Sequence, residues 1–88
     1  PPRFPFGQLI ITAAAAEVIP ADEAVLALRR HAAGDWGELC PEDWARNDEA
    51  LRNGDRLFSC YVTQDKERFW IVTEANRRTT TVLLPSDY

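Results

Sequence analysis

RLFSCYVTQDKERFWIVTEANRRTTTVLLP, residues 56–85, is the stretch that decides the fold. Three runs rich in β-branched and aromatic residues alternate in it with two polar turns. The runs are residues 56–63, 68–73 and 79–84, and the turns are residues 64–67 and 74–78. Such runs favour strands, short polar turns favour hairpins, and the proline at position 85 ends the last run. The stretch therefore predicts a three-stranded antiparallel β-meander.

The residues before this stretch predict one more strand and two or three short helices. The N-terminal arm, residues 1–7, holds three prolines, which exclude a helix there. The expected strand is residues 8–12, and the expected helices are residues 13–18, 20–33 and 41–53. Together these elements predict a single α+β domain, residues 1–88, in which helices pack on one face of a three- or four-stranded antiparallel sheet.

Apolar spacing indicates which side chains the helices and the arm bury. The second expected helix has one apolar face, formed by Ala21, Val25, Leu28 and Ala32. The third has a thinner apolar stripe, so we expect it to lie on the surface, held by Trp44 and Leu51. In the arm, Phe4 and Phe6 are expected to dock on the body of the domain.

The charge of the chain is uneven. The formal net charge is −4, but residues 17–55 hold ten acids against four arginines, whereas residues 56–88 hold five bases and four acids. An acidic chain is poorly suited to bind nucleic acid directly, because such binding needs lysine and arginine to replace phosphate counterions. An acidic surface can instead attract a basic partner or imitate DNA phosphates. The alternative is that these acids are solvated helix faces and first-turn residues that favour the helix dipole.

A protein-binding surface is the first candidate site. It would comprise the acidic helical surface and the loop GDWGE, residues 34–38. The candidate residues are Asp35, Trp36, Glu38, Glu42, Asp43 and Glu49. Tryptophan is common at interface hot spots, and Trp36 lies between glycines and acids, so we expect its side chain to be partly exposed.

Catalytic and metal chemistry have weaker support. His31 is the only histidine and sits at an expected helix C-terminus, where a cation is favourable without any catalytic role. One histidine and two separated cysteines do not make a zinc site, so we expect neither metal nor cofactor. A ribonuclease site is the alternative, with cations to stabilise a phosphorane and other groups to move protons. Its residues would be Arg56, Tyr61, Arg68, Glu74 and Arg78.

We expect a cytoplasmic protein. The sequence has no basic segment followed by an apolar core of the signal-peptide kind, and no apolar run approaches transmembrane length. We also expect a protein partner and a monomer or homodimer. A structural or regulatory homodimer, formed through an edge strand, is a further functional alternative.

Five segments of the chain match a known pattern. They are GDWGE (34–38), ND (47–48), RLFSCY (56–61), WIVTEANR (70–77) and TTVLLPSDY (80–88). The chain resembles a family of small proteins encoded on bacterial plasmids and integrative elements, with Asn76 where that family usually has aspartate and Ser86-Asp87 in place of its glutamate-bearing end. The resemblance implies a mobile-element origin and an α+β fold, and it brings no activity.

A mobile-element origin favours two functional hypotheses. Small acidic proteins of such elements often block host defence machinery, as anti-CRISPR and anti-restriction proteins do. Ribonuclease toxins of the RelE or barnase kind are the enzymatic alternative, but these are usually basic because they grip RNA. The acidic composition therefore favours a non-enzymatic binding protein.

Overall fold

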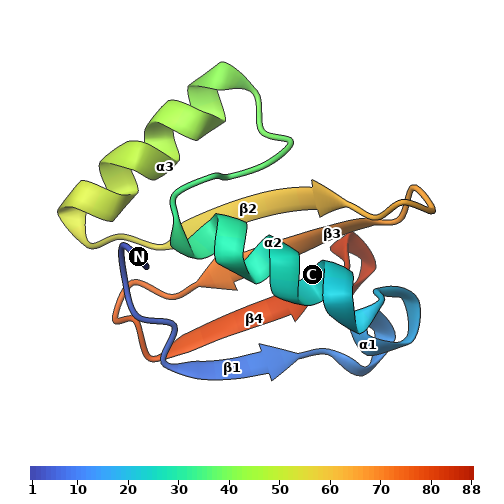
Figure 1. Cartoon of the computed structure of the whole chain (residues 1–88). Helices are drawn as coiled ribbons and strands as arrows, with labels where there is room; N and C mark the ends of the chain where they lie inside the picture. Colours follow the sequence, from blue (N-terminus) through green and yellow to red (C-terminus); the bar gives the residue numbers. More distant parts are fainter.

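The computed structural model describes residues 1–88 and has an α+β fold (Figure 1). The elements are β1 (Gln8–Ile11), α1 (Ala13–Val18), α2 (Ala21–Ala32), α3 (Pro41–Asn53), β2 (Leu57–Val62), β3 (Arg68–Thr73), β4 (Thr79–Leu83) and the 3₁₀ turn η1 (Pro85–Asp87). Both the expected order of elements and the α+β class are confirmed. No helix is of the length and apolar character needed to cross a membrane.

The sheet has the strand order β1-β4-β3-β2. β2, β3 and β4 pair antiparallel, which confirms the meander. β1 pairs parallel with β4, so the sheet is mixed and the expectation of a purely antiparallel sheet is wrong. The reason is the helical crossover, which returns the chain to its starting end so that β2 runs in the direction of β1. Two hairpin reversals then give β4 that same direction.

α2 and α1 cover one face of the sheet (Figure 1). The core lies between these helices and the sheet, where small residues of the helices pack against large residues of the strands. It consists of Ala15, Ile19, Ala24, Ala27, Tyr61, Phe69, Ile71 and Val82. α2 buries Ala24, Ala27 and His31, whereas Val25, expected on the buried face, is 50% exposed. The helix is rotated relative to the expected face because alanines allow a closer approach to the aromatic strand residues than valine does.

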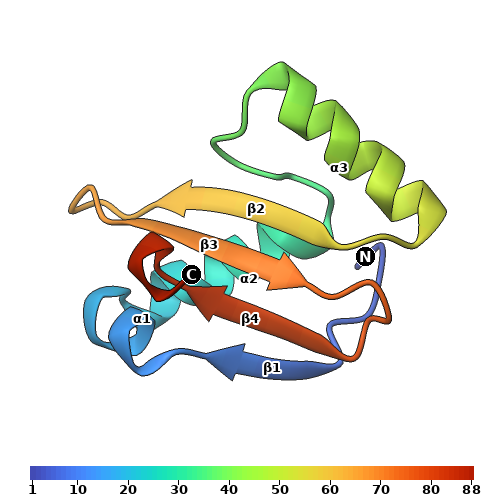
Figure 2. The ribbon, with the colours of Figure 1, turned by 180° about the vertical axis from the view of Figure 1, so that it is seen from behind.

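The opposite face of the sheet carries only the C-terminal η1 turn, and α3 lies beyond the β2 edge (Figure 2). A second, smaller cluster joins α3 to the sheet. Phe4, Trp36 and Leu57 are buried in it, with Trp44 and Leu51 packed against them. The arm is thus docked through Phe4, as expected, and α3 is held through Trp44 and Leu51.

Candidate functional site

The loop between α2 and α3 is fastened to the middle of β2. The N–H of Cys60 donates to the Trp36 carbonyl at 3.1 Å, and the N–H of Glu38 donates to the Cys60 carbonyl at 2.7 Å. Gly37 sits between these bonds with φ of 77°. A Cβ atom at Gly37 would lie 2.1 Å from the Cys60 carbonyl oxygen, so only glycine fits this approach.

Trp36 is fully buried, so the expectation of a partly exposed side chain is wrong. The pairing of the loop backbone with β2 turns the indole inward, where it stacks on Phe4 with ring centroids 6.4 Å apart. Its Nε1–H donates to Asp48 Oδ1 at 3.0 Å. Trp36 therefore offers no surface to a partner and holds the loop and α3 together.

Asp35 also serves the shape of the loop. Its carboxylate accepts from Arg30 Nε at 2.8 Å and from the Gly37 N–H at 3.1 Å. The Arg30 hydrogen bond, assisted by the Gly37 N–H, holds the pKa of Asp35 below its ordinary value. The Asp35 carbonyl accepts from the Tyr61 hydroxyl at 2.7 Å. Two of the six predicted binding residues, Asp35 and Trp36, are thus structural.

Asn47 fixes α3 to the β2 edge. Its Oδ1 accepts from the Phe58 N–H at 3.1 Å, and its Nδ2 donates to the Phe58 carbonyl. The side-chain amide therefore satisfies both backbone groups that Phe58 directs outward. The role of Asn47 was missed in the sequence analysis, although a polar residue on the stripe of Trp44 and Leu51 was a signal for it.

The other four acids of the predicted binding surface are exposed. They are Glu38, Glu42, Asp43 and Glu49. Asp43 lies 3.2 Å from Arg46 and Glu49 lies 3.7 Å from Arg52, each one turn away on α3. All four partners of these pairs have side chains that are at least 51% exposed. Such surface pairs contribute only about 0–1 kcal/mol each, so they leave the acids available to another cation.

The net charge of the molecule is confined to α3 and the residues beside it. Residues 38–55 carry six acids and two arginines, which is a net charge of −4, the value for the whole chain. The rest of the chain holds eight acids and eight bases and is neutral. α3 lies beyond the β2 edge of the sheet (Figures 1 and 2), and we call the exposed acids of this segment the acidic surface of α3.

A shallow and largely apolar hollow lies beside the first two turns of α3. It has a volume of about 340 Å³ and is lined by Leu39, Pro41, Trp44, Ala45 and Asp48. The surface of α3 therefore combines exposed acids with a concave apolar region. This combination of an apolar centre and a charged rim is typical of protein-binding surfaces.

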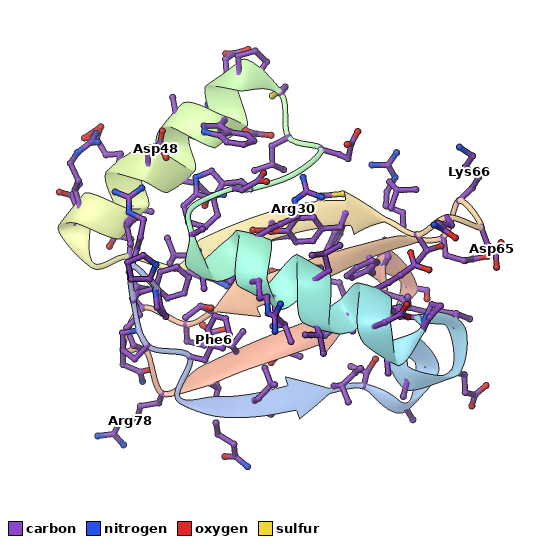
Figure 3. The ribbon with its side chains drawn as sticks, in the orientation of Figure 1. Phe6, Arg30, Asp48, Asp65, Lys66 and Arg78 are labelled. Atoms are coloured by element: carbon purple, nitrogen blue, oxygen red, sulfur yellow. The ribbon has the colours of Figure 1, made fainter.

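The residues of the predicted ribonuclease site do not converge. Arg56 and Glu74 form an ion pair of 3.6 Å at one end of the meander, whereas Arg68 begins β3 at the other end and donates to Cys60 Sγ. Arg78 lies in the turn before β4, far from the β2–β3 turn (Figure 3). Tyr61 is buried on the helical side, where burial raises its pKa. Arg56, Glu74 and Arg78 thus share one end of the meander, but Arg68 and the buried Tyr61 lie away from them, so the five side chains do not form one compact site.

His31 is the centre of a buried hydrogen-bond chain that joins α2 to the sheet. Its Nδ1 lies 2.5 Å from Ser59 Oγ, and its Nε2 lies 2.9 Å from Thr73 Oγ1. Thr73 Oγ1 lies 2.8 Å from Thr80 Oγ1, which donates to the Phe6 carbonyl at 2.9 Å. All four side chains are fully buried.

The Phe6 carbonyl at the end of this hydrogen-bond chain can only accept, and this determines which group donates in every other bond of the chain. The Thr80 hydroxyl donates its hydrogen bond to the Phe6 carbonyl. Thr73 must therefore donate to Thr80 and accept from His31 Nε2–H. His31 Nδ1 then accepts the proton of Ser59. Burial, with the charge of Arg77, lowers the pKa of His31 to about 3, so the imidazole is neutral. A fully buried and fully bonded histidine positions the arm and α2 and has no access to a substrate.

No group of three or more histidine, cysteine, aspartate or glutamate side chains is placed to hold a metal ion. Comparison of the chain with protein-family models, with curated proteins and with solved structures finds no match. Of the candidate sites, the acidic surface of α3 is the one whose predicted residues are mostly exposed.

Proposed function

We propose that this protein is a non-enzymatic binding domain that docks a basic protein on the acidic surface of α3. The observation that carries the proposal is the segregation of charge, since residues 38–55 hold the entire net charge of the chain. Exposed Glu38, Glu42 and Glu49 would meet the cations of the partner. Long-range attraction of this kind raises association rates and selects partners of the opposite charge.

The apolar hollow beside α3 would supply the anchor for this complex. Charge pairs at an exposed rim add little affinity, and most binding energy comes from a few buried apolar or aromatic side chains. Trp44 and Leu39 line the hollow and are only partly buried within the chain itself. An apolar side chain that is flanked by lysine or arginine would match both features of this surface.

The kind of partner follows from the same chemistry. Proteins that process nucleic acids carry basic grooves for phosphates, and a rigid acidic surface can occupy such a groove. We therefore propose a nucleic-acid-processing protein as the target. Inhibition of a bacterial defence protein, of the anti-CRISPR or anti-restriction kind, is the form of this proposal that fits the mobile-element resemblance.

Two charge-reversal variants test the proposal. The first replaces Glu38, Glu42 and Glu49 by lysine on the α3 surface. The control replaces Glu17, Asp65 and Glu67, which are exposed elsewhere, and so changes the net charge by the same amount. The tagged proteins are used to capture partners from a bacterial lysate, and captured proteins are identified by mass spectrometry.

We expect the wild type and the control to retain a basic protein that high salt releases, and the α3 variant to lose it. Binding of that protein, once purified, would then be measured by calorimetry with all three chains. Equal loss of binding in both variants would show that binding depends only on net charge. Equal retention of binding would show that the partner binds elsewhere on the molecule. Either result, or the capture of no protein at all, would contradict the proposal.

A further inference from the structure

The outer edge of β1 is apolar and unpaired. Leu9, Ile10 and Ile11 are 51%, 38% and 46% exposed, and every residue of the strand is exposed. Both views of the ribbon show no segment beyond β1 on this side of the sheet (Figures 1 and 2). Three consecutive exposed large apolar residues on an edge strand are a ready site for strand addition.

The backbone of β1 also directs free hydrogen-bonding groups outward. The N–H groups of Gln8 and Thr12 donate to the carbonyls of Arg78 and Val82 on the β4 side, at 2.8 and 3.1 Å. Alternate residues of a strand direct their backbone groups to opposite sides. The N–H and C=O groups of Leu9 and Ile11 therefore point away from β4, toward any strand that arrives at this edge.

The other edge of the sheet is covered along most of β2. Asn47 occupies the outward backbone groups of Phe58, and Trp36 and Glu38 occupy those of Cys60. β1 has no such cover, and residues 8–12 contain neither a proline nor a charged residue. The fold therefore protects one edge against strand addition and leaves the other available.

We infer that β1 pairs with β1 of a second copy of this chain, antiparallel and centred on Ile10, to form a continuous eight-stranded sheet. In this register Leu9 lies opposite Ile11 of the second copy, and Ile11 lies opposite its Leu9. These pairs exchange the outward N–H and C=O groups, so four backbone hydrogen bonds form. The side chains of both pairs lie on the helical side, and the two copies of Ile10 meet on the other face.

The charge distribution permits a second copy as the occupant. Residues 4–16 form the longest stretch of the sequence without a charged residue, so two acidic molecules can meet there without repulsion. α3 lies at the opposite edge of each sheet. Seven strand spacings of about 4.8 Å would separate the two β2 strands by roughly 34 Å, far beyond the screening length of about 8 Å in physiological salt.

Val25 extends the apolar strip. Glu23, Leu26 and Arg30 line the hollow that α2 forms with Tyr61 and Val62, on the β2 side. Val25 lies on the other flank of the helix, toward β1, and is half-exposed. Strand pairing would bring this flank of both copies toward the seam, above the Leu9 and Ile11 pairs.

The dimer would carry two acidic α3 surfaces at its outer ends. A partner with two basic sites at a matching distance could then bind both, and the second contact would form at high effective concentration. The inference stands independently of that partner, because it concerns the chain alone.

Light scattering and sedimentation of the full chain test the dimer. We expect the wild type to be a dimer that dissociates on dilution. The variant Leu9→Lys with Ile11→Lys places lysine opposite lysine in both pairs, and we expect it to raise the dimer dissociation constant by at least ~10-fold. Circular dichroism would show that its fold is retained, since both side chains are already exposed.

A charge-swapped variant tests the register itself. Leu9→Glu with Ile11→Lys places glutamate opposite lysine in both pairs only if the strands are antiparallel and centred on Ile10. We expect this variant to dimerise and the double-lysine variant to mix with a double-glutamate variant as a heterodimer. A wild type that stays monomeric up to its solubility limit would overturn the inference. So would a dimer that the double-lysine variant leaves unchanged.

Discussion

The side-chain amide of Asn47 pairs with the backbone of Phe58 as a neighbouring strand would. Oδ1 accepts from the Phe58 N–H, and Nδ2 donates to the Phe58 carbonyl. Asn47 is 6% exposed, so water cannot replace these bonds. One residue of α3 thus covers the sheet edge at Phe58 and, with Trp44 and Leu51, holds the acidic helix in place.

Replacing Asn47 by aspartate should destabilise the fold by about 2–4 kcal/mol. The carboxylate keeps the acceptor for the Phe58 N–H but faces the Phe58 carbonyl with a second acceptor, which leaves buried polar groups unsatisfied. Urea unfolding followed by tryptophan fluorescence measures the loss. Asn53→Asp, at the exposed end of α3, is the control and should change stability by less than about 0.5 kcal/mol. Equal effects of the two substitutions would contradict the role of Asn47.

Two glycines with the same backbone conformation should respond differently to alanine. Gly37 and Gly54 have φ of 77° and 74°, but a Cβ at Gly54 meets nothing within 4 Å, whereas one at Gly37 meets the Cys60 carbonyl. Gly54→Ala should cost about 1–2 kcal/mol, from the left-handed conformation alone. Gly37→Ala should cost clearly more, because the loop must leave β2. Chemical denaturation of both variants compares the two free energies, and similar values would argue against a tight loop contact.

Stability should fall between pH 7 and pH 5 because of His31. The pKa of His31 is lowered to about 3 in the folded state, whereas an unfolded histidine has a pKa near 6.5. Below pH 6.5 His31 is protonated in the unfolded chain but stays neutral in the folded chain, so acid favours unfolding. The loss from pH 7 to pH 5 should be about 2 kcal/mol.

The chain has a single histidine, so His31→Gln isolates this effect. The variant should be less stable at neutral pH, since it disturbs the Ser59–Thr73 chain, but its stability should change little between pH 7 and pH 5. Thermal unfolding at several pH values gives the slope for both proteins. An unchanged slope in the variant would mean that other groups cause the acid sensitivity.

Substitutions of the neighbouring acids Asp48 and Glu49 should have different effects on stability. Asp48 accepts from the buried Trp36 indole N–H, whereas Glu49 is exposed beside Arg52. Asp48→Ala should cost about 2 kcal/mol, because it leaves a buried donor unsatisfied, and Glu49→Ala should be within about 0.5 kcal/mol of the wild type. Both remove one negative charge, so a difference in unfolding free energy does not come from net charge and indicates the loss of the Trp36 hydrogen bond.

The order and type of the elements could be predicted from the sequence because local signals specify them. Alternation in residues 56–84 predicted the meander, and the acids after Pro20 and Pro41 predicted the starts of α2 and α3. The parallel pairing of β1 with β4 was not predicted. It depends on how the helices return the chain across the sheet, which no local pattern encodes.

The candidate site was predicted only in part. The acidic charge of α3 follows from counting residues, and four of its predicted acids are exposed. The burial of Trp36 could not be inferred, because it results from backbone bonds between its loop and Cys60, over twenty residues away. The His31 chain likewise joins residues from α2, β2, β3 and β4. Ser59, Thr73 and Thr80 each lie two positions from a core residue and so on the same face of their strand, which was a usable signal.

The pairing of β1 with β4 has a consequence for the growing chain on the ribosome. Gln8 pairs with Thr79 and Ile11 pairs with Val82, so β1 has no partner until β4, 71 positions further along the chain, has emerged. Contacts between such distant residues slow folding, and an exposed apolar segment promotes aggregation during that interval. Translation speed and chaperone supply would therefore affect the yield of this protein even when the folded chain is stable.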